Sequence, residues 1–136
     1  MPKNYDPQEV EPQLIDMWME AGAYRRSKGV GDCTVTIPPP NVTGMLHMGH
    51  ALDDTIQDTI VRYNRMKGYS TRWILGTDHA GIATQTKVDK KLKSEGISRL
   101  EIGREKFIDA CWDWTHEYGG TIVSQIKRMG CSVDFE

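Results

Sequence analysis

The sequence alternates short runs of β-branched and apolar residues with longer segments of helical periodicity. Cys33-Thr-Val-Thr-Ile37 and Thr71-Arg-Trp-Ile-Leu75 have the composition of buried strands. A helical repeat follows each of them, from about His47 to Gly68 after the first and over about 81–93 after the second. The order strand–helix–strand–helix is typical of βαβ units, whose strands run parallel. We therefore predict an α/β fold with a parallel sheet and flanking helices.

Two further helices are expected near the ends of the sequence. Asp6-Pro7 suits a helix start, because aspartate caps helix N-termini and proline is favoured at the first helical position. Gly22 is expected to end that helix. A last helix is predicted from about Glu105 to Met129, and Gly119-Gly120 in its middle is expected to bend or break it.

The domain organisation suggested by these elements is incomplete. We expect residues 1–32 to form an N-terminal helix and connector, and residues 33–136 to form the first half of a larger domain. Two strands make a small sheet, and the last residues, 133–136, have no strand partner in view. The chain therefore reads as a fragment, although the sequence does not say whether 136 residues is its natural length.

Composition excludes several classes of protein. Hydrophobic residues make up 38% and charged residues 26%, as in an ordinary globular protein. The net charge of −2 provides no general electrostatic attraction to nucleic acid. No run of about 18 apolar residues predicts a membrane span. The odd number and wide spacing of Cys33, Cys111 and Cys131 argue against a disulfide framework and favour a reducing, intracellular setting.

The segment 38–51, Pro-Pro-Pro-Asn-Val-Thr-Gly-Met-Leu-His-Met-Gly-His-Ala, joins the first strand to the long helix. Ligands of open α/β sheets bind at such junctions, and a helix N-terminus favours an anion. Gly44 would allow a left-handed turn or a close backbone approach, and Gly49 would let a ligand lie against the first helical turn. His47 and His50, three residues apart, could both donate hydrogen bonds to phosphate oxygens.

Other interpretations of this segment are open from the residues alone. An HxxH pair also occurs on ordinary surfaces and in metal sites. A zinc site would need His79 or Cys33 in addition, but neither CxxC nor HExxH accompanies the pair. The proline run could be no more than a stiff connector.

A second loop, Gly76-Thr-Asp-His-Ala-Gly-Ile-Ala-Thr-Gln85, follows the second strand and should face the same crevice. Asp78 could pair with an ammonium group or could cap the third helix. The lysines of that helix are interpreted as solvated surface rather than as nucleic-acid contacts, and Trp112 and Trp114 as packing residues.

Together the two loops resemble the signatures of class I aminoacyl-tRNA synthetases. His47-Met48-Gly49-His50 is similar to the HIGH motif of that family, and its surroundings resemble the valyl version. The 76–85 loop is similar to the GTDHAGIATQ stretch of the valyl enzymes. Thr77 stands where isoleucyl and leucyl enzymes usually have tryptophan, which favours valine. The resemblance spans nearly the whole chain, but only these two loops are sharply specific.

The resemblance implies a fold and a set of site residues. The fold would be a partial Rossmann-like (HUP-type) parallel sheet, the first half of a class I synthetase catalytic domain. The two histidines would be catalytic, by stabilising the ATP phosphates. The residues that bind ATP would be Thr43, Gly44, His47, Gly49 and His50. The residues that bind the amino acid would be Pro39, Pro40, Asn41 and Asp78, with Asp78 holding the α-amino group.

The implied activity is ATP-dependent formation of valyl-adenylate, for transfer to tRNA(Val) in the cytoplasm. Mg²⁺ is implied by phosphoryl chemistry, but no ligands for it are identifiable. The family's KMSKS-like loop, editing domain and anticodon-binding helices are absent, so tRNA contacts and full activity would need the remainder of a synthetase chain. We expect the isolated chain to be inactive or weakly active. Two alternatives are another HIGH-type nucleotidyltransferase and a non-catalytic ATP-binding fragment.

Overall fold

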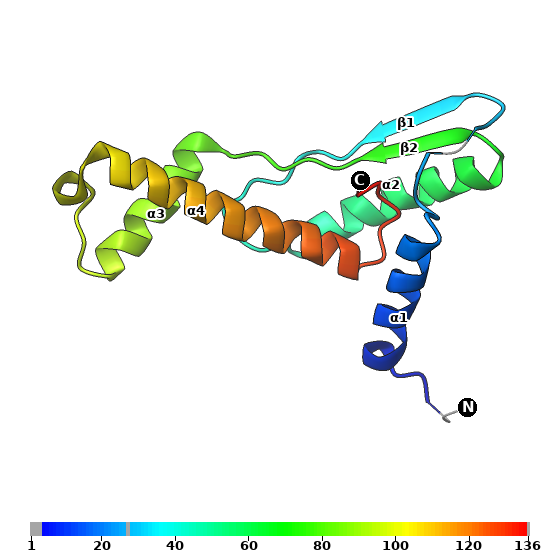
Figure 1. Cartoon of the computed structure of the whole chain (residues 1–136), viewed down its shortest axis with the longest axis horizontal. Coiled ribbons are helices and arrows are strands. Elements are labelled where there is room, and N and C mark those ends of the chain that lie inside the picture. The colour runs from blue at the N-terminus through cyan, green and yellow to red at the C-terminus, as the bar shows by residue number, and fades with distance from the viewer. Residues whose placement is uncertain (1–3, 27, 136) are drawn as a thin grey trace. The chain divides into compact units, whose positions relative to one another are not determined.

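The computed structural model describes residues 4–26 and 28–135 (Figure 1). The described residues form two compact units. The first contains the chain up to Pro38, His47–Gly76 and the chain from Ser124 onward, and the second contains Pro39–Leu46 and Thr77–Val123. The expected division after residue 32 stays a prediction. In chain order the elements are α1 (Pro7–Glu20), β1 (Asp32–Thr36), α2 (Met48–Met66), β2 (Ser70–Ile74), α3 (Gly81–Ser94) and α4 (Arg99–Arg128).

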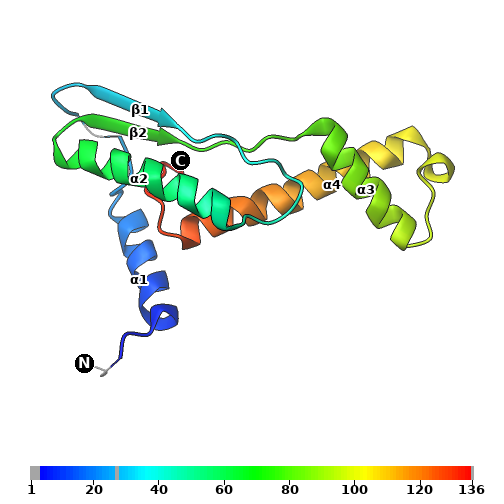
Figure 2. The same ribbon diagram turned by 180° about the vertical axis from the view of Figure 1, so that it is seen from behind.

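The sheet of the first unit confirms the predicted α/β class. β1 and β2 pair in parallel, in a register that runs from Asp32 opposite Ser70 to Thr36 opposite Ile74. α2 packs against both strands, as the views from both sides show (Figures 1 and 2). The indole Nε1–H of the fully buried Trp73 donates to a side-chain oxygen of α2 at 3.2 Å. This is the expected β–α–β crossover.

The first helix begins where its sequence signals place it. Asp6 is the N-cap, and its Oδ1 accepts a hydrogen bond from the Gln8 N–H at 2.9 Å. Pro7 occupies the first helical position. Gly22, with φ of 61°, follows the end of the helix in the left-handed conformation that glycine adopts without strain. None of the described helices is long and apolar enough to cross a membrane.

The last helix begins near its predicted start but is interrupted at a different glycine. α4 spans Arg99–Arg128 with a kink at Gly103, so its long part begins just after Gly103, close to the predicted Glu105. Gly103, with φ of 79° and ψ of 169°, lies in a region that is essentially restricted to glycine. The backbone stays helical through Gly119-Gly120, so a break there is wrong.

The end of the chain also has a partner that the sequence did not indicate. The Asp134 N–H donates to the Trp73 carbonyl oxygen at 3.2 Å, and Asp134 forms a parallel bridge with Ile74. Asp134 therefore lies beside the end of β2 in an isolated bridge, so the expectation that residues 133–136 lack a strand partner is wrong for Asp134. Residue 136 lies outside the described residues.

The apolar stripe of α2 has the predicted spacing but faces solvent. Leu52, Ile56, Ile60 and Tyr63 are 64%, 54%, 49% and 59% exposed. The buried residues of α2 are Asp54 and Val61, which lie on other faces of the helix. The helix therefore packs on the two strands through a small surface and leaves its main apolar face uncovered.

Candidate functional site

The HxxH pair forms the amino-terminal cap of α2. His47 is the N-cap residue, with an extended φ of −130° and ψ of 175°. The Gly49 N–H donates to His47 Nδ1 at 3.1 Å, and the His47 N–H donates to His50 Nδ1 at 3.2 Å. The two imidazole rings lie close together, with centroids 4.0 Å apart. The structure thus brings together the two histidines predicted to be catalytic.

These hydrogen bonds determine which ring nitrogen can donate. A neutral imidazole carries one N–H, and a nitrogen that accepts a hydrogen bond cannot hold the proton. Because Nδ1 accepts in both rings, His47 and His50 must each carry their proton on Nε2. The capping arrangement leaves both Nε2–H groups to donate elsewhere. Two neighbouring donors beside a helix N-terminus form a suitable site for phosphate oxygens.

The electrostatic environment of His50 favours this neutral form. Partial burial and the nearby His47 lower the pKa of His50 below its ordinary value, while Asp53 opposes that shift. A second proton on His50 would also convert Nδ1 from an acceptor into a donor and break its bond with the His47 N–H. The cap is therefore compatible with the neutral imidazole.

The two glycines of the segment have different surroundings. A Cβ on Gly49 would lie 3.0 Å from Cε1 and 3.1 Å from Nδ1 of His47. The missing side chain of Gly49 therefore makes room for the His47 ring. Gly44 does not adopt a positive φ, and a Cβ there would meet nothing within 4 Å. Of the alternatives considered for Gly44, the left-handed turn is wrong.

In the second unit, the backbone joins the two predicted substrate loops directly. The Val42 N–H donates to the Asp78 carbonyl oxygen at 3.0 Å, and the Asp78 N–H donates to the Pro40 carbonyl oxygen at 2.9 Å. Asn41 and Asp78 form a parallel bridge, and both are exposed. The prediction that the two loops lie next to each other is thus confirmed for residues 40–42 and Asp78.

The Asp78 carboxylate is oriented by its own turn. Its Oδ1 accepts from the Ala80 N–H at 2.9 Å. Ala80, with a left-handed φ of 47°, is the N-cap of α3. Asp78 is therefore not the N-cap of that helix, and its second carboxylate oxygen remains exposed for another donor.

The predicted site residues thus fall into two groups. One group lies at the start of α2 in the first unit, and it comprises His47, Gly49 and His50. The other belongs to the second unit, and it comprises Pro39, Pro40, Asn41, Thr43, Gly44 and Asp78. That both groups line one cleft remains a prediction. No group of three or more His, Cys, Asp or Glu side chains suited to a metal ion occurs among the described residues.

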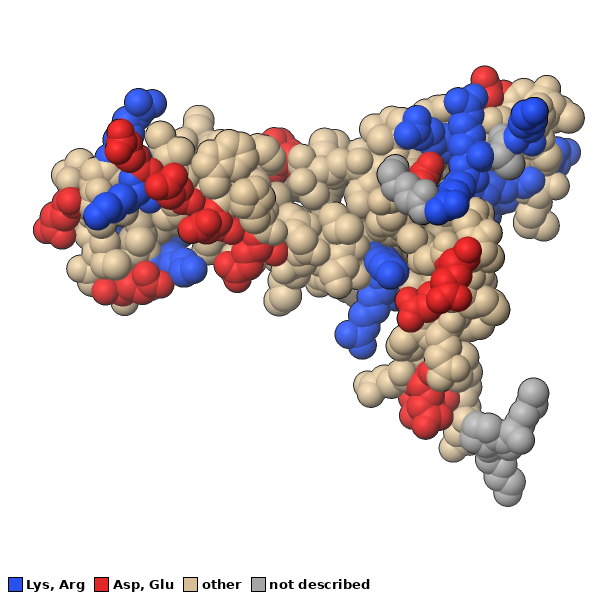
Figure 3. Space-filling model, in the orientation of Figure 1, with Lys and Arg blue, Asp and Glu red and all other residues tan. Residues whose placement is uncertain are grey.

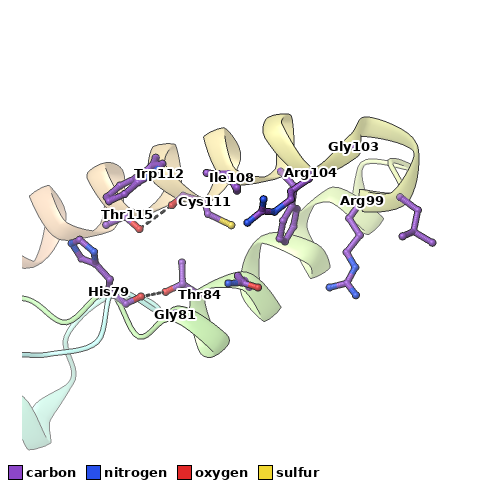
Figure 4. A pocket seen from close by; sticks show the side chains of 13 residues that line it. His79, Gly81, Thr84, Arg99, Gly103, Arg104, Ile108, Cys111, Trp112 and Thr115 are labelled. Carbon is purple, nitrogen blue, oxygen red and sulfur yellow. Dashed lines mark hydrogen bonds between the residues drawn. The ribbon is translucent and has the colours of Figure 1, made fainter.

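A pocket of about 580 Å³ lies between α3 and α4 in the second unit. The sequence does not predict it. His79 and Trp112 lie at one end of it, with ring centroids 5.4 Å apart, and Arg99 and Arg104 lie at the other (Figure 4). Its residues come from segments far apart in the sequence, so no local motif indicates it.

Acidic side chains follow one side of α4. Aspartate or glutamate recurs at every fourth position from 101 to 117, so that the carboxylates form a ridge visible in Figure 3. The members of this ridge are exposed: Glu101, Glu105, Asp109, Asp113 and Glu117. Such a ridge repels phosphate groups, so this side of α4 is unsuited to RNA backbone.

Comparisons with known proteins agree with these features. Residues 13–136 match the family described as "tRNA synthetases class I (I, L, M and V)". Valine–tRNA ligase from Porphyromonas gingivalis is 54% identical over 132 residues, which cover 96% of this chain and 15% of the relative. The enzyme of the same name from Thermus thermophilus is 49% identical over 136 residues, covering 99% of this chain and 16% of the relative. The chain therefore spans about 15% of the length of these curated relatives.

Among solved structures, the chain resembles one described as the ternary complex of Agrobacterium radiobacter K84 agnB2 LeuRS with tRNA and LeuAMS. The TM-score is 0.75 at 18% identity, and the match covers 96% of this chain and 15% of that chain. This likeness shows a shared fold. Since the family match extends over residues 13–136, the chain belongs to the class I tRNA synthetases of the I, L, M and V group.

Proposed function

We propose that this chain supplies the ATP- and valine-binding part of a valine–tRNA ligase. The observation that carries the proposal is the identity of 54% and 49% with valine–tRNA ligases over nearly all of this chain. Those relatives are several times longer, so ligation as a whole is proposed for the complete enzyme. The other substrates would be ATP and tRNA(Val), and a cytoplasmic location would fit this part in protein synthesis.

The reaction begins with attack by a carboxylate oxygen of valine on the α-phosphorus of ATP. A new O–P bond gives valyl-adenylate, and the bond from the α-phosphorus to the bridging oxygen breaks, so that pyrophosphate leaves with the electron pair. Negative charge on the phosphate oxygens increases along this path. The Nε2–H groups of His47 and His50 would donate to those oxygens, and the cap hydrogen bonds at Nδ1 of both rings support this role because they keep the proton on Nε2.

Asp78 would hold the substrate ammonium group. One of its oxygens is fixed by the Ala80 N–H, and the other is exposed. A charge-assisted hydrogen bond from the ammonium would orient the valine carboxylate toward ATP. Thr43, Gly44 and Gly49 would line the ATP site. Pro39, Pro40 and Asn41 would line the amino acid pocket.

Magnesium would accompany the phosphates, as it does in phosphoryl transfer generally. The described residues offer no ready cluster of carboxylate ligands for it. Bound Mg²⁺ would neutralise part of the phosphate charge. The protein side chains would have two roles: the two imidazoles would donate hydrogen bonds to the phosphates, and Asp78 would hold the ammonium group.

The test is valine-dependent ATP–pyrophosphate exchange. It should be measured on this chain and on a chimera in which this chain replaces the segment that it matches in the Thermus thermophilus enzyme. We expect exchange in the chimera and little or none in the chain alone. His47→Ala or His50→Ala should each lower the chimera's rate by about 10²–10³. His116→Ala, an exposed histidine of α4, is the matched control and should leave the rate near that of the parent chimera.

The alternatives predict different results in the same assays. A different HIGH-type nucleotidyltransferase would exchange pyrophosphate with an acceptor other than valine. A non-catalytic fragment would bind ATP in calorimetric titration, yet the chimera would give no exchange with any amino acid. Exchange that needs valine but is unaffected by both histidine substitutions would leave the family assignment intact and would refute the role given to the pair.

A further inference from the structure

We infer that Trp114 on α4 is a positioning residue for the paired loops that carry Asn41 and Asp78. The inference rests on the proposed function, because it concerns how the amino acid site is held in shape. The effect of Trp114 would pass through the backbone of Val42, which is fully buried.

A hydrogen bond connects α4 to the first loop. The Trp114 Nε1–H donates to the Val42 carbonyl oxygen at 2.7 Å, across 72 residues of sequence. The N–H of the same residue donates to the Asp78 carbonyl oxygen at 3.0 Å. Val42 therefore joins the helix on one side to the second loop on the other. A buried carbonyl that lost its donor would be destabilising, so the loop would shift to find another partner.

The indole is itself held in place by its neighbours on two helices. The Tyr118 ring stacks on it, with centroids 4.2 Å apart, and the Lys91 ammonium of α3 lies 5.9 Å from its centroid. These contacts restrict rotation of the indole, so the direction of its N–H is fixed. A donor with a fixed direction can define where a backbone segment lies.

α4 also lies beside both loops at Gly119. A Cβ at Gly119 would lie 3.9 Å from Val42 Cγ1 and 4.0 Å from Thr77 Oγ1, which is ordinary van der Waals distance. Val42 follows Asn41, and Thr77 precedes Asp78, so this turn of the helix lies next to the immediate neighbours of both proposed substrate residues.

The consequence should be larger for amino acid binding than for ATP binding. The loops held by Trp114 carry all the residues proposed to bind valine and two of those proposed to bind ATP, Thr43 and Gly44, whereas the histidine cap belongs to α2 in the other unit. In the chimera, Trp114→Phe keeps an aromatic ring and removes the donor. We expect the KM for valine to rise about tenfold, which corresponds to about 1.4 kcal/mol. The KM for ATP should rise by a smaller factor, because the histidine cap would still hold the phosphates.

Trp73→Phe is the matched control. The indole of Trp73 also donates a hydrogen bond, to Gln57 at 3.2 Å, and is fully buried, but it lies in the first unit. This substitution should lower the melting temperature without raising the KM for valine. The inference is refuted if Trp114→Phe leaves that KM unchanged, or if Trp73→Phe raises it equally.

Amide hydrogen exchange tests the role of Trp114 without any measurement of activity, so its result does not depend on the proposed function. In this chain, amide hydrogen exchange at Val42 and Asp78 should become faster in Trp114→Phe and stay unchanged in Trp73→Phe. Tyr118→Leu, which loosens the indole but keeps its N–H, should give a smaller change in the same direction. An inactive parent chimera would refute the proposed function alone. If amide exchange at Val42 and Asp78 is unchanged in both Trp114→Phe and Tyr118→Leu, Trp114 does not position the loops.

Discussion

Asp58 of α2 accepts two hydrogen bonds from Ser132, which lies 74 residues further along the chain. One comes from the backbone N–H at 3.0 Å and the other from the hydroxyl. The second carboxylate oxygen of Asp58 accepts from Arg62 Nε at 2.7 Å, and Arg62 also donates to the Gly130 carbonyl oxygen at 2.7 Å. Through these hydrogen bonds, α2 holds residues 130–132, which lead to Asp134 beside β2.

Asp58→Asn should therefore destabilise the segment that leads to Asp134. An amide keeps the shape of the side chain but loses the charge that pairs with Arg62 and one acceptor oxygen. We expect the free energy of unfolding to fall by about 1–3 kcal/mol in urea titrations. The Asp134 amide should also exchange faster. Asp53→Asn is the control, because Asp53 is exposed and accepts a hydrogen bond from Gln57 of the same helix. That substitution should cost about 0.5 kcal/mol or less. If Asp58→Asn and Asp53→Asn lower the free energy of unfolding equally, the hydrogen bonds between Asp58 and Ser132 do not hold the segment before Asp134.

Asp54 gives the fold a defined pH dependence. Burial, assisted by the adjacent Asp53, raises the pKa of Asp54 from 3.8 to about 6. The folded chain therefore binds this proton more tightly than the unfolded chain does. As a result, the contribution of Asp54 to stability falls as pH rises from about 4 to about 6, and the loss is complete above that range.

The neutral isostere should remove this penalty. We expect Asp54→Asn to raise the free energy of unfolding at pH 7.5 by about 1–3 kcal/mol, since each unit of pKa shift corresponds to about 1.4 kcal/mol. At pH 4 the gain should vanish. Thermal unfolding followed by circular dichroism at the two pH values measures the difference. A gain of the same size at both values would mean that desolvation of the charge is not its cause.

The glycines of α4 provide a third prediction, because they differ in conformation. Gly120 is helical, and a Cβ there would meet nothing within 4 Å. Gly120→Ala should stabilise the chain by about 0.5–1 kcal/mol. A Cβ at Gly103 also meets nothing within 4 Å, but its φ of 79° and ψ of 169° suit glycine alone. Gly103→Ala should cost about 1–3 kcal/mol for that reason. Urea titration of both variants checks the pair, and the same sign in both would contradict the position of the break.

The local elements could be predicted because their signals are local. The Asp6-Pro7 start, the strand compositions and the helical repeat of α2 depend on neighbours within a few residues, and the structure agrees with them to within a few positions. The parallel order followed from connection rules alone. The closeness of Asn41 and Asp78 followed in turn from the parallel order, because loops at the same ends of parallel strands are neighbours.

What could not be predicted depends on partners far along the chain. Trp114 was interpreted as a packing residue, and nothing near it in the sequence shows that its N–H meets Val42, 72 residues away. The pairing of Asp134 with β2 likewise depends on a residue far along the chain. That His47 and His50 cap α2 was also not predicted. A capping box joins residues three positions apart, so the spacing of the two histidines could have indicated it.

The exposed stripe of α2 leads to a last prediction, about how this chain behaves in solution. Leu52, Ile56 and Ile60 are each about half exposed or more and repeat along one side of the helix. A contiguous apolar surface of this kind promotes self-association. In sedimentation velocity, this chain should form oligomers as its concentration is raised. Replacing all three residues with glutamine should leave it monomeric.

The control must separate the stripe from apolar exposure in general. Ile82→Gln and Leu100→Gln remove two side chains that are 87% and 85% exposed but belong to the second unit. If association depends on the α2 stripe, this pair of changes should leave the sedimentation coefficients of this chain unchanged. Retained stability of the α2 triple variant in urea would show that the three side chains contribute little to the fold of this chain. Oligomers that persist in the α2 variant and disappear in the control would place the associating surface on the second unit instead.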